Sequence, residues 1–188
     1  MIYFVRHGST DWNLNKDANG NIVPRCQGWA DIPINEVGKG QAQKIAEELK
    51  NIKFDKVFCS PLTRAKQTCE IITRLPYEID NRIIERNFGE FEGLMHHEFD
   101  FKGFLNPKND GTYISAEDVE PFMQRVFSFL DELKKYKNKN ILVVSHGAVA
   151  VTTMVYFLGR PDGKNLDEYI FPNGTYKVFN YSCEYDKQ

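Results

Sequence analysis

Short apolar runs alternate along this chain with longer segments of helical periodicity. Ile2–Arg6, Val57–Cys59 and Ile141–Val144 are brief and rich in β-branched or aromatic residues, which predicts buried strands. Thr175–Tyr181 alternates weakly between apolar and polar residues, and this pattern predicts a last strand at the edge of a sheet.

Four segments predict helices. Val119–Leu133 has the clearest pattern, because its apolar residues recur at three- and four-residue steps, the spacing of one helical face. Gly38–Lys50 and Leu62–Leu75 carry shorter versions of this pattern, and Ala148–Leu158 is apolar enough for a buried helix. Strands that alternate with helices form a mostly parallel sheet covered on both faces, so we predict the α/β class.

One segment resembles a membrane span when only its length and its lack of charged residues are considered. Ile141–Leu158 contains no Lys, Arg, Asp or Glu. The order of residue types in this segment favours a buried strand, a tight turn at Ser145-His146-Gly147 and then a helix. Near the amino terminus, Arg6 and His7 interrupt the apolar run before a signal peptide can form. We therefore expect no membrane association.

Composition and charge narrow the classes of protein further. The 188 residues suit a single domain over 1–188. The 24 basic and 26 acidic side chains give a net charge of −2, which offers no general field for nucleic acid or anionic lipid. Four cysteines without C-x-x-C spacing indicate free thiols in a reducing compartment, so we expect a cytoplasmic protein.

Ligands of such sheets bind beyond the carboxyl ends of the strands, and the residues found there are chemically distinctive. The segments expected at these ends are Arg6-His7-Gly8, Ser60-Pro61-Leu62-Thr63-Arg64, Glu85-Arg86 after Ile83-Ile84, and Ser145-His146-Gly147. Arginine suits phosphate oxygens, neutral imidazole is a nucleophile, and a glutamic acid can protonate a leaving alkoxide. The set predicts phosphoryl transfer through a phosphohistidine, with neither metal nor other cofactor.

Five ordered blocks resemble the histidine phosphatase superfamily, the phosphoglycerate-mutase-like proteins. They are Val5–Asn13, Gln27–Pro33 with Gly38 and Gln41-Ala42, Ser60–Thr68, Glu85–Gly93 and Val144–Ala148. A lone Arg-His-Gly would be weak, but five blocks in family order span nearly the whole chain. The resemblance implies a three-layer α/β/α sandwich whose mostly parallel sheet has an antiparallel edge strand. It is consistent with a small inserted or lid region at about 94–118.

The resemblance also implies roles for individual residues. His7 would be the phosphorylated nucleophile, and Glu85 would be the proton donor that later activates water. The phosphate would be held by Arg6, Arg64 and His146, with Asn13 as a further donor. The backbone at Gly147 and the side chain of Thr10 would approach the phosphate, and Gln27 and Gly28 would lie at the pocket entrance.

Several interpretations stay open on the residues alone. Spacing does not choose Glu85 over Glu90 and Glu92; the family match does. Glu117 lies in a segment that departs from the family's Gly-Glu-Ser pattern, which leaves its role in doubt and Ser115 as a simple helix cap. The roles of Arg25 and Arg86 are open, between solvent exposure and contact with substrate.

The aromatic and histidine-rich region after residue 95 is also ambiguous. His96-His97 suggests metal, but adjacent residues point apart on a helix and no third ligand is spaced nearby, so we expect no metal site. Phe99, Phe101 and Phe104 suit either core packing or an apolar wall over the pocket.

We expect a metal-independent phosphomonoesterase of the histidine acid phosphatase type, acting on a small-molecule phosphate ester. Phosphoglycerate mutase is the alternative within the superfamily. The mutases are longer and shield their phosphohistidine, whereas only about forty residues follow Ala148 here, which favours hydrolysis. A non-catalytic phospho-ligand-binding domain is a third class. Neither the substrate nor the oligomeric state can be inferred from the sequence.

Overall fold

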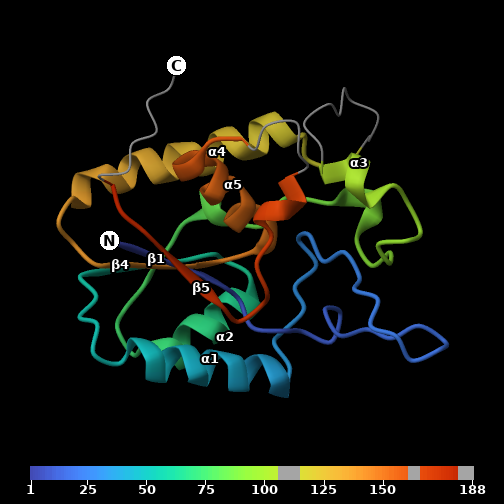
Figure 1. Cartoon of the computed structure of the whole chain (residues 1–188), viewed down its shortest axis with the longest axis horizontal. Helices are drawn as coiled ribbons and strands as arrows, with labels where there is room; N and C mark the ends of the chain where they lie inside the picture. Colours follow the sequence, from blue (N-terminus) through green and yellow to red (C-terminus); the bar gives the residue numbers. More distant parts are fainter. Residues whose placement is uncertain (106–114, 161–165, 182–188) are drawn as a thin grey trace.

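A five-stranded sheet forms the centre of the molecule. The computed structural model describes residues 1–105, 115–160 and 166–181. The strands are β1 (Ile2–Arg6), β2 (Lys56–Cys59), β3 (Glu78–Ile79), β4 (Ile141–Ser145) and β5 (Tyr176–Phe179), in the order β3-β2-β4-β1-β5. Neighbouring strands are parallel except β1 and β5, which pair antiparallel at the edge (Figure 1).

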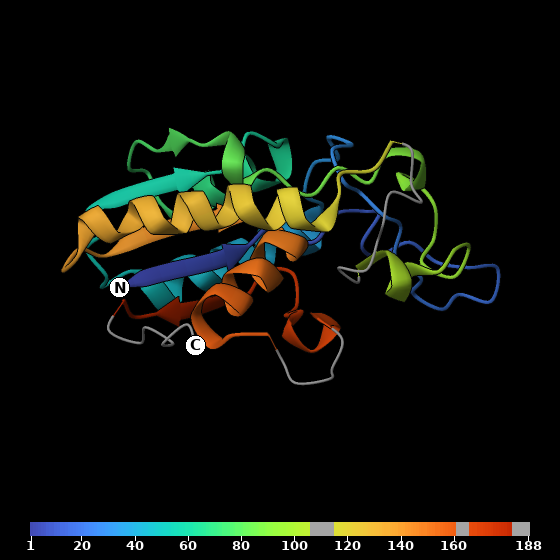
Figure 2. The same ribbon diagram turned by 90° about the horizontal axis from the view of Figure 1, so that it is seen from above.

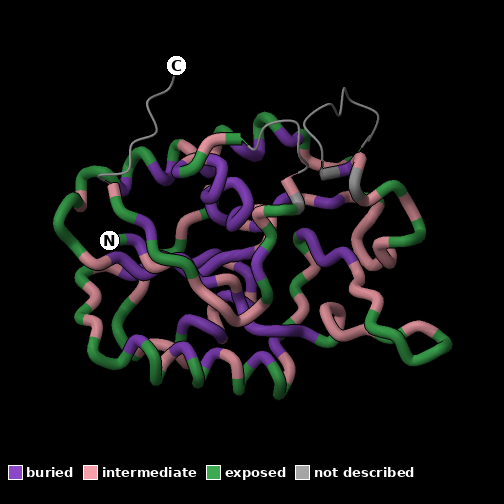
Figure 3. The backbone as a smooth tube through the Cα atoms, in the orientation of Figure 1, coloured by how far each residue is buried: buried purple, intermediate pink, exposed green. Residues whose placement is uncertain are grey.

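Helices cover both faces of this sheet, so the predicted three-layer α/β/α sandwich is confirmed. The helices α1 (Glu36–Leu49) and α2 (Thr63–Ile72) lie on one face, and α4 (Val119–Leu133) and α5 (Gly147–Leu158) lie on the other (Figures 1 and 2). Buried backbone is concentrated in the strands and on the helix sides that face them (Figure 3).

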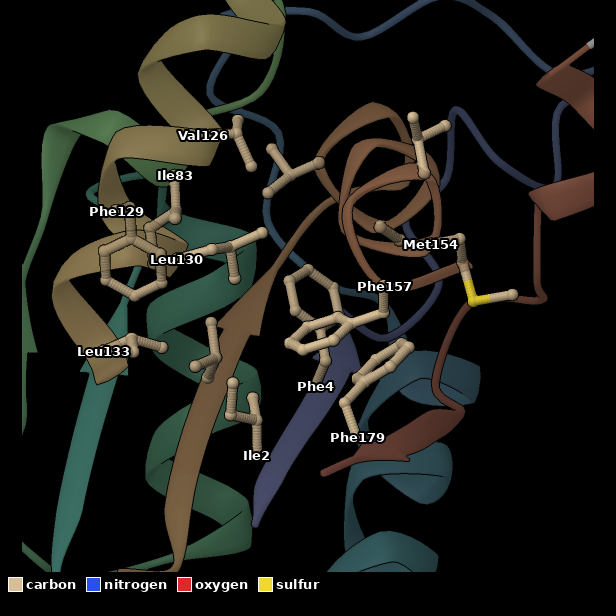
Figure 4. Packing of buried hydrophobic residues seen from close by; sticks show 14 of the residues in the cluster. Ile2, Phe4, Ile83, Val126, Phe129, Leu130, Leu133, Met154, Phe157 and Phe179 are labelled. Carbon is tan, nitrogen blue, oxygen red and sulfur yellow. The ribbon is translucent and has the colours of Figure 1, made fainter. Parts of the chain in front are cut away.

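The alternation of side chains along each strand divides the core into two layers. In β1, Ile2 and Phe4 pack among α4 and α5 residues, whereas Val5 joins the cluster beneath α1 and α2. Figure 4 shows the larger cluster, in which Phe4 from β1 and Phe157 from α5 share one layer with α4 residues such as Leu130. All five residues of β4 are buried, as expected for a central strand covered on both faces.

The observed helix boundaries follow local chemistry. The helix α4 has the predicted bounds, because its apolar face is long and continuous. The helix α1 begins two residues before the predicted start, since the Asn35 side chain accepts from the Gly38 amide at 3.0 Å and caps it. The helix α2 ends at Ile72, three residues earlier than predicted.

Short elements escaped prediction. They are α3 (Phe101–Leu105) and the 3₁₀ turns η1 (Asn81–Ile83), η2 (Gly89–Phe91), η3 (Lys134–Tyr136) and η4 (Leu166–Tyr169). The expectation that a strand ends at Ile83-Ile84 is wrong: Ile83 belongs to η1, and the preceding strand is β3. The lid predicted at about 94–118 includes residues 106–114, which lie outside the described residues, so it stays a prediction.

The stretch Ile141–Leu158 divides as predicted. It forms strand β4, a turn at His146 and helix α5. Among residues 1–105, 115–160 and 166–181, no helix is long and apolar enough to cross a membrane.

Candidate active site

The carboxyl ends of the parallel strands β1 and β4 bring the two histidines together. His7 follows β1, His146 follows β4, and their ring centroids are 5.2 Å apart. Both side chains are almost completely buried. The His7 amide donates to the Ser145 carbonyl at 2.9 Å, which extends the β1–β4 pairing to the site. Parallel register therefore places two residues 139 positions apart side by side.

One hydrogen bond determines which His7 nitrogen is available for chemistry. Nδ1 lies 2.8 Å from the carbonyl oxygen of Gly8. Because a carbonyl only accepts, Nδ1 carries the proton and donates it, and Nε2 carries the lone pair. Asn173 adds a second constraint, since its side-chain amide donates to the His7 carbonyl at 3.2 Å. The ring is therefore oriented with Nε2 unprotonated, which is the form that a nucleophile requires.

Two arginines flank the histidines, and each is anchored to backbone carbonyls by its terminal nitrogens. Arg64, in the first turn of α2, donates to Gly28 O at 2.7 Å and to Ala30 O at 2.8 Å. Arg6, at the end of β1, donates to Phe171 O at 2.7 Å. Within the described part of the chain, the buried Nε atoms of both arginines lack a hydrogen-bond partner. Buried cationic donors of this kind suit an anionic ligand.

The electrostatic environment keeps both histidines neutral. Burial, followed by the charges of Arg64 and Arg6, holds the pKa of His7 well below its ordinary value. Burial and the same arginines depress the pKa of His146, with His7 contributing. Burial lowers the pKa of Arg64 to about 10, which leaves it charged at neutral pH. Neutral imidazoles beside fixed positive charges form a site for a nucleophile and an anion.

His146 and Ser60 form a hydrogen-bonded pair behind this surface. Their Nε2 and Oγ atoms lie 2.6 Å apart, and Ser60 itself follows β2. The Nδ1 atom of His146 is buried and has no hydrogen-bond partner among the described residues.

Glu85 is held at the start of α5. Its Oε2 accepts from the Gly147 amide at 3.0 Å, and its Oε1 accepts from the Ala148 amide at 3.2 Å. The neighbouring Arg86 amide also donates to Oε1, at 3.0 Å. Free amide groups at a helix start attract an anion, and here the anion is this carboxylate. The Gly147 amide, expected near the phosphate, is therefore already engaged by Glu85.

An ion pair from outside the predicted set positions the backbone of Glu85. Arg125 on α4 donates to the Glu85 carbonyl at 3.0 Å and to the Ile84 carbonyl at 2.8 Å. The same guanidinium binds both carboxylate oxygens of Glu117, at 2.7 and 2.8 Å. Glu117 in turn accepts from the Asn87 amide at 3.2 Å. This geometry gives Glu117, whose role the sequence left open, a structural role in the Glu85 loop.

A cavity of about 370 Å³ opens onto these groups. Eight of the ten predicted site residues line it: Arg6, His7, Asn13, Gln27, Gly28, Arg64, Glu85 and Gly147. Thr10 and His146 do not. Thr10 is fully buried, with its hydroxyl 3.1 Å from Asn13 Oδ1 and 3.0 Å from Gln27 Oε1, so it supports two cavity residues from behind. Direct contact of these two side chains with a phosphate stays a prediction.

Other cavity residues went unassigned in the sequence. Asn173, which precedes β5, lies in the sequence Asn173-Gly174-Thr175, which carries no signal of a catalytic or phosphate-binding residue. Arg25 and Arg86, left open, both line the cavity. His96 lines it too and stacks on Phe101, with ring centroids 3.8 Å apart.

The aromatic residues near this cavity divide between the two interpretations. Phe101 lines the cavity, whereas Phe104 is fully buried and packs against Phe88 in a small core. Residues 10–33 and 88–105, which carry much of this end of the molecule, lie together beyond the sheet (Figures 1 and 2). A backbone bridge between Arg25 and Met95 joins them.

The sheet and the site together define a phosphoglycerate-mutase-like α/β enzyme. The chain belongs to the histidine phosphatase superfamily (branch 1), whose family model matches residues 2–185. It is 36% identical over 151 residues to the uncharacterized phosphatase PhoE of Bacillus subtilis, covering 78% of this chain and 72% of that protein.

Other similarities cover more of the chain. It is 31% identical to phosphoserine phosphatase 1 of Hydrogenobacter thermophilus, covering 95% of this chain and 85% of the relative. The solved structure of a phosphoglycerate mutase from Thermus thermophilus superposes with a TM-score of 0.71 at 24% identity, over 93% of this chain and 90% of that one. That structural likeness shows the fold, and the sequence relatives place the chain among phosphatases and phosphoglycerate-mutase-like proteins.

Proposed function

We propose that the protein is a metal-independent phosphomonoesterase that hydrolyses a small phosphorylated metabolite through a phosphohistidine on His7. One observation carries this proposal: Nε2 of His7 bears its lone pair in a cavity lined also by Arg6, Arg64 and Glu85. A neutral nucleophile, fixed positive charge and a carboxyl group are the parts that phosphoryl transfer requires.

In the first step, Nε2 of His7 attacks phosphorus and the bond from phosphorus to the alcohol oxygen breaks. Glu85 in its acid form gives its proton to the departing oxygen, so the alcohol leaves neutral. In the second step, the Glu85 carboxylate takes a proton from water as the water oxygen attacks phosphorus. The phosphorus–nitrogen bond breaks, phosphate leaves and His7 returns to its neutral form.

The two arginines stabilise charge in both steps. The Nε donors of Arg6 and Arg64 have no other partner among the described residues, so phosphate oxygens would satisfy them. Their anchoring to carbonyls near Gly28 and Phe171 keeps them in place, which lowers the cost of reorganisation during the reaction.

Turnover of p-nitrophenyl phosphate in the presence of a metal chelator tests the proposal. We expect phosphate release that is abolished in His7→Ala and retained in His97→Ala, an identical substitution at an exposed histidine. Acid-labile, base-stable labelling of the wild-type protein by radioactive substrate, absent from His7→Ala, would identify the intermediate. Binding of phosphate without turnover would favour a non-catalytic phospho-ligand-binding domain.

Glu85→Gln tests the acid. We expect a loss of about 10²–10⁴-fold on an alkyl phosphate, whose leaving group needs a proton. The loss should be much smaller on p-nitrophenyl phosphate, because p-nitrophenolate leaves readily without one. Equal losses on the two substrates would reject Glu85 as the general acid.

Phosphoglycerate mutase is the second candidate, favoured by the 30% identity to phosphoglycerate mutase-like protein 4 of Arabidopsis thaliana over 95% of this chain. Both candidates predict labelled His7. Only a mutase would isomerise 3-phosphoglycerate after priming with a bisphosphate, and only a phosphatase would release phosphate in every turnover.

A further inference from the structure

The cavity extends well beyond the space that a phosphate group needs. Its volume of about 370 Å³ falls within the usual range of small-molecule sites. The groups proposed to act on the phosphate, His7, Arg6, Arg64 and Glu85, account for one part of its lining. The rest of the lining would contact the alcohol portion of a phosphate ester.

One wall of the cavity is mostly apolar and comes from the amino-terminal parts of two helices. Val119, Phe122 and Met123 line it from α4, and Ala148, Val151 and the polar Thr152 line it from α5. The two α4 side chains Phe122 and Met123 are each only 2% exposed, and Val151 is 9% exposed. These residues belong to the folded core and turn only their edges toward the cavity, so they form a fixed wall.

This wall begins at the proposed proton donor. Ala148 lines the cavity, and its amide donates to Oε1 of Glu85 at 3.2 Å. A leaving oxygen protonated by Glu85 is therefore carried by a group next to α5. The position of the acid directs the alcohol portion toward the apolar residues.

Another part of the lining is His96 stacked on Phe101, with an angle of 9° between the rings. Burial, together with the charge of Arg6, lowers the pKa of His96, so this ring is neutral at pH 7. A neutral imidazole stacked on a phenyl ring presents a flat surface of low polarity. The cavity lining thus includes a flat aromatic pair as well as the wall from α4 and α5.

Two further arginines line the cavity, and both donate to the protein backbone. Arg25 donates to the Gly93 carbonyl at 2.8 Å. Arg86 donates to the carbonyls of Glu117 and Phe104, each at 2.7 Å, and its guanidinium lies 4.0 Å from the Phe104 ring centre. These contacts give both cations a role in holding loops together.

We propose that the substrate is the phosphate monoester of an apolar alcohol, whose hydrocarbon portion contacts the α4–α5 wall and the His96–Phe101 pair. This inference rests on the proposed function for its phosphate end. The cavity volume of about 370 Å³ leaves room for this portion beyond the phosphate, and the portion carries no second anionic group. Val119, Phe122, Met123 and Val151 then determine specificity.

Binding of n-alkylphosphonates, from methyl to hexyl, measures the proposal without requiring turnover. We expect affinity by calorimetry to rise about three- to fourfold for each added methylene, the fold-change that corresponds to about 0.8 kcal/mol per buried CH₂. The kcat/KM values of the matching alkyl phosphates should rise in parallel, because their leaving groups are equally basic. Affinity that does not change with chain length overturns the proposal.

A carboxylate-ended chain distinguishes an apolar pocket from a second anion site. We expect 6-phosphonohexanoate to bind at least tenfold more weakly than hexylphosphonate, because its carboxylate must be buried beside apolar residues. Tighter binding of the carboxylate compound would assign the far end of the cavity to Arg25 and Arg86 and refute the proposal.

A matched pair of substitutions tests whether the dependence of affinity on chain length arises at the α4–α5 wall. Met123→Gln should lower the hexyl-to-methyl affinity ratio about tenfold, because a buried amide replaces an apolar surface of the cavity. Met154→Gln places the same change in the same core cluster away from the cavity lining and should leave that ratio intact. Equal ratios in the two variants refute the assigned location. Chain-length dependence without turnover would retain this inference and reject the phosphatase.

Discussion

The ion pair between Arg125 and Glu117 should stabilise both the fold and the loop that carries Glu85. The Arg125 guanidinium makes five hydrogen bonds, two to the Glu117 carboxylate and three to the carbonyls of Arg82, Ile84 and Glu85. Arg125→Met keeps a side chain of similar length and removes every donor. Both charged side chains of the pair are 20% exposed.

The expected loss of stability follows from the charged group that Arg125→Met leaves unpaired. Removing one partner of a buried ion pair costs about 3–5 kcal/mol, and partial exposure of this pair reduces the expected cost to about 2–4 kcal/mol. Urea denaturation measures the free energy of unfolding. Arg160→Met removes an arginine from an exposed pair with Glu120, where about 0–1 kcal/mol is expected, and so provides the control.

A double variant separates the cost of leaving the Glu117 carboxylate unpaired from the cost of lost packing. Glu117→Gln combined with Arg125→Met should destabilise the protein by about 0.5–3 kcal/mol less than the sum of the single changes, because no unpaired carboxylate remains. In activity assays, Arg125→Met should impair alkyl phosphates more than p-nitrophenyl phosphate, since a displaced Glu85 no longer delivers its proton. A destabilisation below 1 kcal/mol together with an unchanged ratio of the two activities would refute this reasoning.

Two further predictions concern stability. Gly38→Ala should lower the free energy of unfolding in urea by about 1–3 kcal/mol or more, because the added Cβ would lie 2.2 Å from the Ser9 carbonyl oxygen. Gly40→Ala, in the same helix with open space around it, should instead raise the free energy of unfolding by about 1 kcal/mol. The depressed pKa values of His7 and His146 mean that only the unfolded chain takes up these protons just below pH 6.5. Unfolding free energy, measured in urea from pH 7.5 to 5, should therefore be full above pH 6.5 and fall below it, by up to about 1.4 kcal/mol per pH unit for each histidine; a flat profile, or one unaltered in a His146→Gln variant, would contradict this.

Regular elements with strong patterns were predictable. The helix α4 needed only its own sequence, because seven of its side chains are buried along one face. Strand β4 and helix α5 were separable because Gly147 and a polar turn interrupt the apolar run. By contrast, β3 has only two residues, both exposed, and owes its existence to pairing with β2, so no local pattern announces it.

The candidate site likewise contains features that the sequence predicted and features that it did not predict. Arg6, His7, Arg64, Glu85 and His146 could be predicted as site residues because each lies in a short motif, and the structure brings them to one end of the sheet. For Glu85 the reasoning about its position was wrong, since it follows a 3₁₀ turn and not a strand.

The sequence by itself determined the class of fold and the family and singled out the candidate site residues, because periodicity and motifs are local properties of a chain. Only the tertiary structure decided which donors are already occupied, such as the Gly147 amide held by Glu85, and which residues support the site from elsewhere, such as Arg125 and Asn173. These contacts join positions far apart in the chain. Their geometry depends on strand order, register and helix packing, which together place apolar residues of α4 and α5 in the same cavity as the candidate site residues.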